Sequence, residues 1–283
     1  MSVPPSPELA SAVGRLIDAA LAEDIGAGDV TSGSVIPEGL RFRGVMAARE
    51  EMVVAGLPFA VEVFHRVVPE ARVAPAVADG DKVAPGQVLA RLEGPARGLL
   101  TAERTALNLL QHLSGIATLT RRYVDAIAGT GATLLDTRKT IPGLRHAAKY
   151  ATRMGGARNH RMGLYDGVLI KDNHIAVCGS VGEAVRRART SGSGEVEVEC
   201  DTIEQVAEAV AAGADIILLD NMAPPSLRRA VAMVGGRART EASGGVNLDT
   251  IRAIAETGVD FVSVGRLTQS ARAVDIGLDW TAE

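Results

Sequence analysis

Short apolar runs alternate with amphipathic segments along the second half of the chain. The runs have the length of buried strands, and most segments between them carry apolar residues at helical spacing. Strands that alternate with helices predict βα units and a parallel sheet. The six runs cover residues 133–139, 166–173, 195–201, 214–221, 238–243 and 260–266, and the clearest helical segments cover residues 180–190, 202–213 and 248–258.

The carboxyl end of each run is polar or rich in glycine. No G-x-G-x-x-G sequence follows the first run, so the pattern favours a closed or nearly closed α/β barrel over a dinucleotide-binding sheet. Because the carboxyl ends of barrel strands form the active site, we expect these residues to surround one mouth. They are Asp136–Lys139, Lys171–His174, Glu199, Asp220–Asn221, Ser243–Gly245 and Gly265–Arg266.

The first half of the chain has a different pattern. Pro7–Ala22 has helical spacing, and the Gly/Ser-rich residues 26–39 predict a loop. A long helical stretch covers residues 99–129, and we expect Gly115 to divide it into two helices.

Residues 77–94 are rich in turns, like the strands of a biotinyl or lipoyl carrier domain. Such carriers present a modifiable lysine at a hairpin tip, typically flanked by Met or Asp. Lys82 lies in DGDKVAPG, which is not that motif, so we interpret the segment as a small β-sandwich without a swinging arm. A carrier module stays an alternative that a lipoyl or biotinyl group on Lys82 would support.

Composition indicates a globular chain that binds no membrane. Of 283 residues, 47% are hydrophobic and 3% aromatic, so the core is built mainly from Ala, Val, Leu and Ile. Cys178 and Cys200 are too few for a disulfide framework, and we expect both to be packing residues. No signal-peptide pattern opens the sequence, and no apolar run approaches the about 18 residues that span a bilayer. The expected location is therefore the cytoplasm.

The net charge of −4 is unevenly distributed along the chain, because one segment is strongly basic. Residues 137–174 contain eight Lys or Arg and two Asp. Such a concentrated window points to a small anion and away from nucleic acid. A duplex would need a broader basic surface, and a single strand would need interleaved aromatic residues. The alternative is a solvated basic face.

Three glutamates alternate with valines in the third run. Glu195, Glu197 and Glu199 share one strand face, which we expect to point into the barrel because helices cover the outer face. Buried carboxylates need partners or a metal, and nearby lysines and arginines are the expected partners. The alternative is a solvated edge strand.

Cations, glycines and acids complete the predicted mouth. Arg138, Lys139, Arg161 and Lys171 form a multi-cation pocket that favours a polyanion. The glycines of Glu241–Gly245 and Val264–Arg266 suggest a phosphate site built from backbone amides. Glu199 and Asp220 are then oxygen ligands for Mg²⁺ or for ribose hydroxyls.

The sequence TRKTIPGLRHAAKYATRMGGARNHRMGLYDGVLIKDNHI, residues 137–175, closely resembles the quinolinate phosphoribosyltransferase family, the carboxylating nicotinate-nucleotide pyrophosphorylases. The likeness spans nearly the whole chain. It continues through Glu195–Glu199, Asp220–Met222, Glu241–Gly245 and Val264–Ser270, and backward through residues 101–118 and 23–32.

The resemblance implies two domains and a homo-oligomer. Residues 1–112 would form an N-terminal α/β sandwich domain, with the C-terminal tail 268–283 packing back on it. Residues 113–267 would form an incomplete parallel α/β barrel of the TIM type. In a homodimer or higher homo-oligomer, Arg104 would reach into the neighbour's site.

The implied reaction is a pentosyl transfer in NAD biosynthesis. Phosphoribosyl pyrophosphate and quinolinate would give nicotinate mononucleotide, pyrophosphate and CO₂, with Mg²⁺ as cofactor. The implied catalytic residues are Lys139, Lys171, Glu199 and Asp220. The substrate ligands would be Thr137, Arg138, Lys139, His160, Arg161 and Lys171 for quinolinate and the phosphates, Glu199 and Asp220 for ribose and Mg²⁺, and Ser243, Gly244, Gly245, Gly265 and Arg266 for the 5′-phosphate.

Two positions depart from the family pattern, which often has Thr where Ile141 stands and His where Gln269 stands; neither replaces a charged contact. A molybdenum-transport-associated paralogue shares the architecture but lacks the segment Lys171–His174. Another alternative is a Schiff-base lyase with Lys171 or Lys139 as nucleophile. The usual nucleobase-phosphoribosyltransferase signature, two acids followed by a TGxT-like loop, is missing from this sequence.

Overall fold

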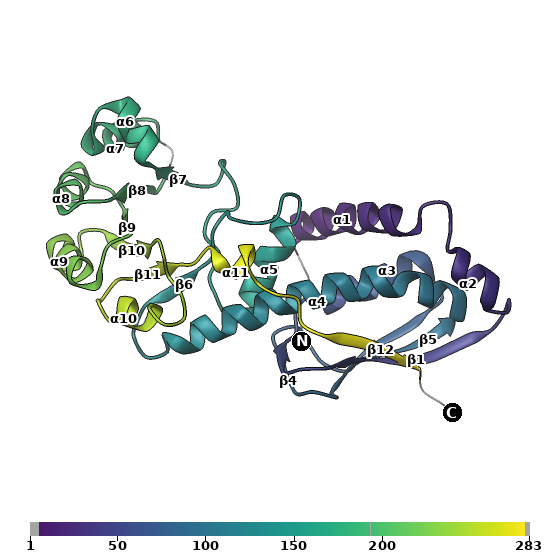
Figure 1. Ribbon diagram of the computed structural model, residues 1–283. Helices are drawn as coiled ribbons and strands as arrows, with labels where there is room; N and C mark the ends of the chain where they lie inside the picture. The colour runs from purple at the N-terminus through teal and green to yellow at the C-terminus, as the bar shows by residue number, and fades with distance from the viewer. Residues whose placement is uncertain (1–5, 193, 281–283) are drawn as a thin grey trace. The chain divides into compact units, whose positions relative to one another are not determined.

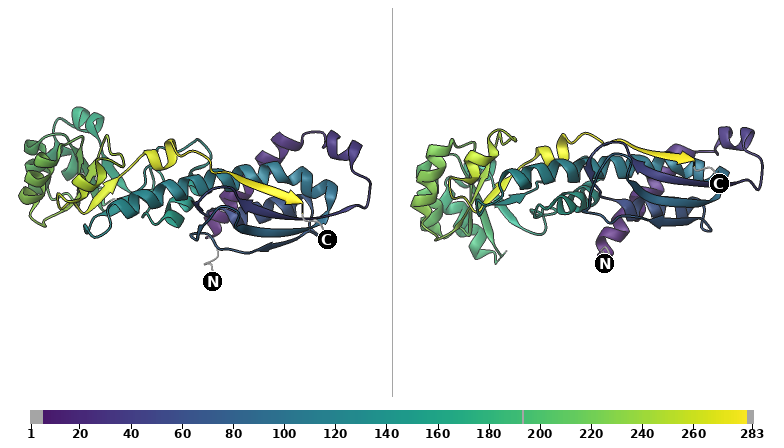
Figure 2. Two further views of the ribbon diagram at one scale, coloured as in Figure 1. Left: turned by 60° about the horizontal axis from the view of Figure 1, so that its bottom comes forward. Right: turned by 90° about the horizontal axis from the view of Figure 1, so that it is seen from below.

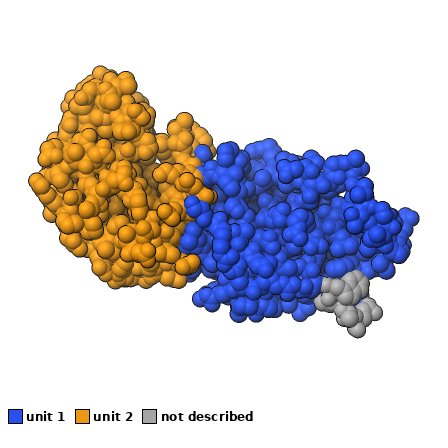
Figure 3. Space-filling model, viewed as in Figure 1, with its two compact units in different colours: residues 1–121, 140–156, 270–283 blue, residues 122–139, 157–269 orange. Residues whose placement is uncertain are grey.

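The computed structural model describes residues 6–192 and 194–280. Residues 1–5, 193 and 281–283 lie outside it, and so do the first five residues of the predicted N-terminal domain and the last three of the predicted tail. The chain divides into two compact units (Figure 3). Unit 1 comprises residues 1–121, 140–156 and 270–283, and unit 2 comprises residues 122–139 and 157–269. The predicted limits at residues 112 and 267 stay a prediction.

Unit 1 is built on an antiparallel sheet with the strand order β12-β1-β5-β3. Alternating burial along β1 explains its place, since Phe42 and Met46 are buried whereas Arg41 and Arg43 are exposed. The strands are β1 (Arg41–Ala48), β3 (Arg72–Pro75), β5 (Val88–Pro95) and β12 (Ile276–Trp280), and a two-stranded sheet joins β2 (Met52–Val53) to β4 (Lys82–Val83).

Two helices open unit 1. In α1 (Pro7–Ile25), the Ser6 hydroxyl accepts a hydrogen bond from the Leu9 N–H at 3.3 Å, which confirms the predicted helix start. The prediction of an uninterrupted loop after it was wrong, because α2 (Val30–Val35) forms there. The Asp29 carboxylate caps α2 by accepting from the Ser32 N–H at 2.9 Å. Hydrogen bonds from the Ser32 hydroxyl, the Ser32 N–H and the Thr101 hydroxyl lower the pKa of Asp29 to about 2.

Helix α4 (Ala96–Ala126) runs without interruption through Gly115, so the predicted break there was wrong. A β-carbon at residue 115 would lie 2.0 Å from the carbonyl oxygen of Arg272, so the glycine allows a backbone segment to pass close to the helix. A glycine inside a helix costs only about 1 kcal/mol, which packing offsets. The remaining helices of unit 1 are α3 (Leu57–Val67) and α5 (Arg145–Gly155).

Unit 2 contains a six-stranded parallel sheet with the order β6-β11-β10-β9-β8-β7. All six predicted strands form in their predicted places, and helices α7 to α10 lie along the outer face of the sheet (Figures 1 and 2). The strands are β6 (Thr133–Leu135), β7 (Val168–Ile170), β8 (Val196–Cys200), β9 (Ile216–Asp220), β10 (Arg239–Ser243) and β11 (Phe261–Ser263). The helices are α6 (Asp172–Cys178), α7 (Val181–Thr190), α8 (Ile203–Ala212), α9 (Pro224–Val234), α10 (Ile251–Ala255) and α11 (Arg266–Gln269).

The sheet of unit 2 is an open barrel, because β6 and β7 are its two edges. Residues 157–167 connect these edges. Arg158 forms an isolated parallel bridge with Leu135, and its N–H donates to the Leu134 carbonyl at 2.9 Å. The predicted fold, a sheet domain followed by an incomplete parallel α/β barrel, is therefore confirmed. None of the helices in the described ranges is both long and apolar enough to cross a bilayer.

Candidate active site

The carboxyl ends of the unit 2 strands surround a cavity of about 600 Å³, here called the carboxyl-end cavity. The parallel register explains the convergence: Ser243 of β10 lies beside Asp220 of β9, and both end their strands. The cavity collects eleven of the fourteen predicted site residues, which are Thr137, Arg138, Lys139, His160, Arg161, Lys171, Glu199, Asp220, Ser243, Gly244 and Gly245.

Three predicted residues lie outside the lining of this cavity. Gly265 lies next to it, since a β-carbon there would be 2.8 Å from Cδ of Lys139. Arg266 is exposed at the start of α11. Arg104 belongs to unit 1, where its side chain is 58% exposed and lies 3.9 Å from Glu103.

The cations of the cavity are compensated by carboxylates. Lys171 Nζ lies 2.5 Å from a Glu199 carboxylate oxygen. Burial lowers the pKa of Arg161, and the neighbouring positive charge of Arg138 lowers it further, while Glu197 and Asp166 act in the opposite direction. Two arginines that repel each other in a half-buried site favour a bound anion.

The glycine loop after β10 is shaped by Asn221. Gly244 and Gly245 both have positive φ angles, of 87° and 63°. A β-carbon on Gly244 would lie 2.2 Å from the Asn221 side-chain oxygen, so no other residue fits there. Asn221 is the one non-glycine residue in the described ranges with positive φ, 52°, and its amide donates to the Asp220 carboxylate at 2.5 Å. The predicted place of Asn221 at the barrel mouth is confirmed, but the sequence assigned it no chemical role.

Three acids could hold a divalent cation. One carboxylate oxygen each from Glu199, Asp201 and Asp220 lies within 4.8 Å of the others. Oxygen ligands of this kind suit Mg²⁺, so the chemistry fits the predicted metal. Asp201 was not among the predicted ligands, although its position two residues after Glu199 places both on one strand face.

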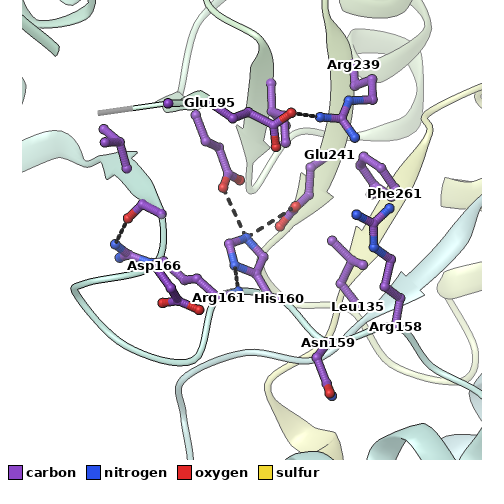
Figure 4. Close-up of a pocket in the computed structure, with 15 residues that line it drawn as sticks. Leu135, Arg158, Asn159, His160, Arg161, Asp166, Glu195, Arg239, Glu241 and Phe261 are labelled. Atoms are coloured by element: carbon purple, nitrogen blue, oxygen red, sulfur yellow. Dashed lines mark hydrogen bonds and ion pairs between the residues drawn. The ribbon is translucent and has the colours of Figure 1, made fainter. Parts of the chain in front are cut away.

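A second cavity, of about 430 Å³, lies at the amino ends of the same strands (Figure 4). We call it the amino-end cavity because the first residues of four strands line it. They are Val168, Ile216, Arg239 and Phe261. His160, Arg161 and Glu241 line both cavities and therefore lie between them.

The three glutamates of the third run have three different partners. Glu195, before β8, pairs with Arg239, and Glu199 pairs with Lys171. Glu197, in the middle, is buried and lies 3.1 Å from Nε2 of His160. The predicted inward face is confirmed. Glu197 interacts with the charge of Arg161, as expected, and a histidine, His160, lies within ion-pair distance of it.

Glu241 of β10 joins the same cluster. Its carboxylate is 1% exposed, lies 3.6 Å from His160 Nε2 and points toward the imidazole (Figure 4). Burial raises the pKa of Glu241 to about 7, and the neighbouring charge of Glu197 raises it as well. Two buried carboxylates thus converge on one ring nitrogen, and protonation of Glu241 reduces their repulsion.

Both halves of the chain match one family. Residues 29–114 match the model "Quinolinate phosphoribosyl transferase, N-terminal domain", and residues 116–279 match the model of the C-terminal domain. The chain belongs to the quinolinate phosphoribosyltransferase family.

Relatives and solved structures agree with this family. The chain is 44% identical over 94% of its length to a probable carboxylating nicotinate-nucleotide pyrophosphorylase of Bacillus subtilis, and 93% of that protein is covered. It is 47% identical over 92% of its length to the Mycobacterium leprae protein of that name, with 94% covered. The solved nicotinate-nucleotide pyrophosphorylase of Francisella tularensis superposes with a TM-score of 0.93 at 41% identity, covering 99% of this chain and 98% of that one. The predicted family and enzyme class, a phosphoribosyltransferase, are confirmed.

Proposed function

We propose that this chain transfers the phosphoribosyl group of phosphoribosyl pyrophosphate to quinolinate with loss of CO₂. The products are nicotinate mononucleotide and pyrophosphate, in the synthesis of NAD. The observation that carries the proposal is the carboxyl-end cavity, where four cations and two acids predicted from the sequence line one space of about 600 Å³. A dicarboxylate and a polyphosphate are the anions that such a cavity suits.

The arginines would bind the pyridine dicarboxylate. Arg138 and Arg161 offer planar guanidinium groups, and each can bind a carboxylate with two parallel hydrogen bonds. The Arg161 guanidinium is already oriented, because its Nη1 donates to the Gly167 carbonyl at 3.1 Å. Binding of two carboxylates would remove the repulsion between the arginines.

The glycine loops would bind the 5′-phosphate. Gly244 and Gly245 leave backbone close to the cavity without side chains in the way, and Ser243 before them adds a hydroxyl group. Gly265 lets Lys139 lie flat against the backbone, which would bring the lysine charge to the same phosphate. Arg266 is exposed next to Gly265 in the chain and would add a further charge.

The acids would stabilise positive charge on the ribose. Mg²⁺ held by Glu199 and Asp220, with Asp201 beside them, would neutralise the pyrophosphate leaving group. The Glu199 and Asp220 carboxylates favour the cationic centre that develops at C1 of the ribose through their field. The pyridine nitrogen then forms the new bond to C1 as the bond from C1 to pyrophosphate breaks. The ring cation favours loss of the adjacent carboxylate as CO₂, and a proton from water takes its place on the ring carbon.

The competing lyase reaction needs an uncharged lysine amine. Lys171 lies 2.5 Å from Glu199, and a carboxylate partner at that distance favours the ammonium form, which is not nucleophilic. This contact favours electrostatic binding over Schiff-base chemistry. Borohydride trapping of a substrate adduct on Lys171 would support the lyase instead.

We further place the enzyme in the cytoplasm as a homodimer or higher homo-oligomer. Cys178 and Cys200 are unpaired, which fits a reducing compartment. The exposed Arg104 side chain would enter the cavity of a partner subunit, where another cation would meet the same anions.

The first experiment mixes the purified protein with quinolinate, phosphoribosyl pyrophosphate and Mg²⁺ and follows nicotinate mononucleotide. We expect product with quinolinate and none with nicotinate, which lacks the second carboxylate. Arg138→Ala and Arg161→Ala should abolish quinolinate binding while the protein stays folded by circular dichroism. Normal affinity in both variants would overturn the assignment of the pocket.

A further inference from the structure

The imidazole of His160 uses both of its nitrogens inside the protein. Nδ1 accepts a hydrogen bond from the backbone N–H of Arg161 at 2.8 Å. Nε2 lies 3.1 Å from Glu197 and 3.6 Å from Glu241. The ring therefore connects the residue that carries the Arg161 guanidinium to two acids on β8 and β10.

These contacts fix the tautomer of His160. Because Nδ1 accepts from an N–H, it holds no proton, and the single ring proton of the neutral imidazole lies on Nε2. This N–H donates to Glu197. A metal ion among His160, Glu197 and Glu241 would need the lone pair of Nε2, so the hydrogen bond from Arg161 disfavours such an ion.

The residues just before the His160 ring are fixed by hydrogen bonds to the carboxylate of Asp136. Asp136, fully buried after β6, accepts from the His160 N–H at 2.9 Å and from the Asn159 amide at 2.6 Å. Residues 158–160 are thus fixed to the β6 edge by the Asp136 carboxylate and by the backbone hydrogen bond from Arg158 to Leu134. The His160 ring then links them to the middle of the sheet.

We propose that His160 is a positioning residue. Its Nδ1 accepts from the Arg161 N–H and its Nε2–H points to Glu197 and Glu241, so that the imidazole orients Arg161. It is then not a direct ligand of quinolinate. This inference rests on the proposed function, since it assigns quinolinate binding to Arg161. It also extends the binding machinery to Glu197, which does not line the carboxyl-end cavity and acts on the substrate only through His160 and Arg161.

Glu197 offers the cleanest test because it is separate from the substrate cavity. Glu197→Met removes the acceptor for His160 at similar volume, whereas Glu197→Gln keeps an acceptor oxygen. Loss of one oriented hydrogen bond should raise the KM for quinolinate about tenfold in Glu197→Met. The KM for phosphoribosyl pyrophosphate should change less than about twofold, and Glu197→Gln should stay within about threefold of the wild type.

Glu195→Met is the matched control, since Glu195 lies on the same strand face but pairs with Arg239. It should leave the KM for quinolinate near the wild-type value. If Glu197→Met behaves like Glu195→Met in a folded sample, the proposal is overturned. A thermal melt of each variant checks that it is folded.

A double substitution tests whether the effect passes through Arg161. In an Arg161→Lys background, where the oriented guanidinium is gone, adding Glu197→Met should raise the KM for quinolinate by no more than about twofold. A full tenfold effect in that background would mean that Glu197 and His160 act independently of Arg161, contrary to the proposal.

Nitrogen-15 spectra of histidine-labelled wild-type protein provide a readout that needs no variant. We expect His160 to show an unprotonated Nδ1 and a protonated Nε2, and to keep this state when quinolinate saturates the protein. A proton on Nδ1, or a new hydrogen bond from the ring to quinolinate, would make His160 a direct ligand and overturn the inference. If the wild type forms no nicotinate mononucleotide, the proposed function fails, yet these spectra still test the link from Arg161 to His160.

Discussion

At the scale of single residues, Asn221 combines an unfavourable backbone angle with two contacts in the site. Its φ of 52° is sparsely populated by residues with a side chain, although asparagine tolerates it better than most. Its amide donates to Asp220, and its N–H donates to the Ser243 carbonyl at 2.9 Å. Strain of this kind is stored where it orients functional groups, here a proposed ribose ligand and the glycine loop.

Two substitutions separate the backbone of Asn221 from its side chain. Asn221→Gly accepts positive φ but loses the amide, so we expect little loss of stability and a fall of about tenfold in kcat/KM for phosphoribosyl pyrophosphate. Asn221→Ala loses both and should also be destabilised by about 1 kcal/mol. Urea unfolding and steady-state kinetics on both variants measure the two effects. Equal stability of the two would show that the backbone angle carries no strain.

Glu241 predicts a pH dependence of stability. Its folded pKa, about 7, lies above the ordinary value of 4.5, so the folded chain binds more protons than the unfolded chain between these values. The stabilisation is present below pH 4.5 and is lost as pH rises through 7. Glu197 from β8 and His160 face Glu241, and Ser263 lies beside it on β11.

Glu241→Gln removes this titration and keeps the shape of the side chain. Relative to that variant, we expect the wild type to lose more than about 1 kcal/mol of unfolding free energy between pH 5 and pH 8. Chemical denaturation at several pH values measures the difference. Parallel curves for the two proteins would mean that Glu241 titrates near its ordinary value.

The sequence identified the cations and acids of the cavity but not the contacts among them. Arg138, Lys171 and Glu199 could be predicted because each follows or ends a strand, and parallel strands bring their ends together. The partners of His160 could not, because the imidazole crosses from an irregular segment to strands β8 and β10. A contact between an irregular segment and distant strands leaves no periodic pattern in the sequence from which it could be predicted.

At the scale of elements, the strands were predicted correctly, whereas helix α2 and the continuity of helix α4 through Gly115 were not. The six barrel strands were found because buried parallel strands form unbroken apolar runs. The missed helix α2 contains Gly33 and two serines, which favour a loop, and only the Asp29 cap and its packing settle the matter. Gly115 was misread because its role is set by a segment more than 150 residues later in the chain, which no local pattern reveals.

Gly115 and Gly14 form a matched pair for testing helix packing. A β-carbon at residue 115 would meet the Arg272 carbonyl at 2.0 Å, whereas at residue 14 it would meet only the flexible end of Arg66 at 3.2 Å. We expect Gly115→Ala to destabilise the protein by more than about 2 kcal/mol. Gly14→Ala, inside α1, should be neutral or stabilise by up to about 1 kcal/mol. Thermal unfolding of both variants measures the two effects. Similar unfolding midpoints would contradict the close approach of the Arg272 carbonyl to Gly115.

At the scale of the whole molecule, the proposed exchange of Arg104 between subunits predicts complementation. Co-expressing Arg104→Ala with Lys171→Ala under different tags gives hybrid dimers. If Arg104 serves the partner's site, each hybrid has one intact site, and the mixture regains about a quarter of wild-type activity.

Lys171→Ala co-expressed with Arg161→Ala is the control. Both residues line the same cavity, so no hybrid contains an intact site and activity should stay at background. Background activity in the Arg104→Ala and Lys171→Ala mixture as well would show that Arg104 acts within its own chain or not at all.

The last strands of the chain complete both sheets. In unit 2, β6 pairs with β11, with Thr133 beside Phe261. In unit 1, β1 pairs on one side with β12, from Gly44 opposite Trp280 to Ala48 opposite Ile276. During synthesis, β6 and β1 each keep an open strand edge until β11 and β12 have been made. A chain that stops before β11 would leave both sheets unfinished, whereas one that stops between β11 and β12 would leave only the sheet of unit 1 unfinished.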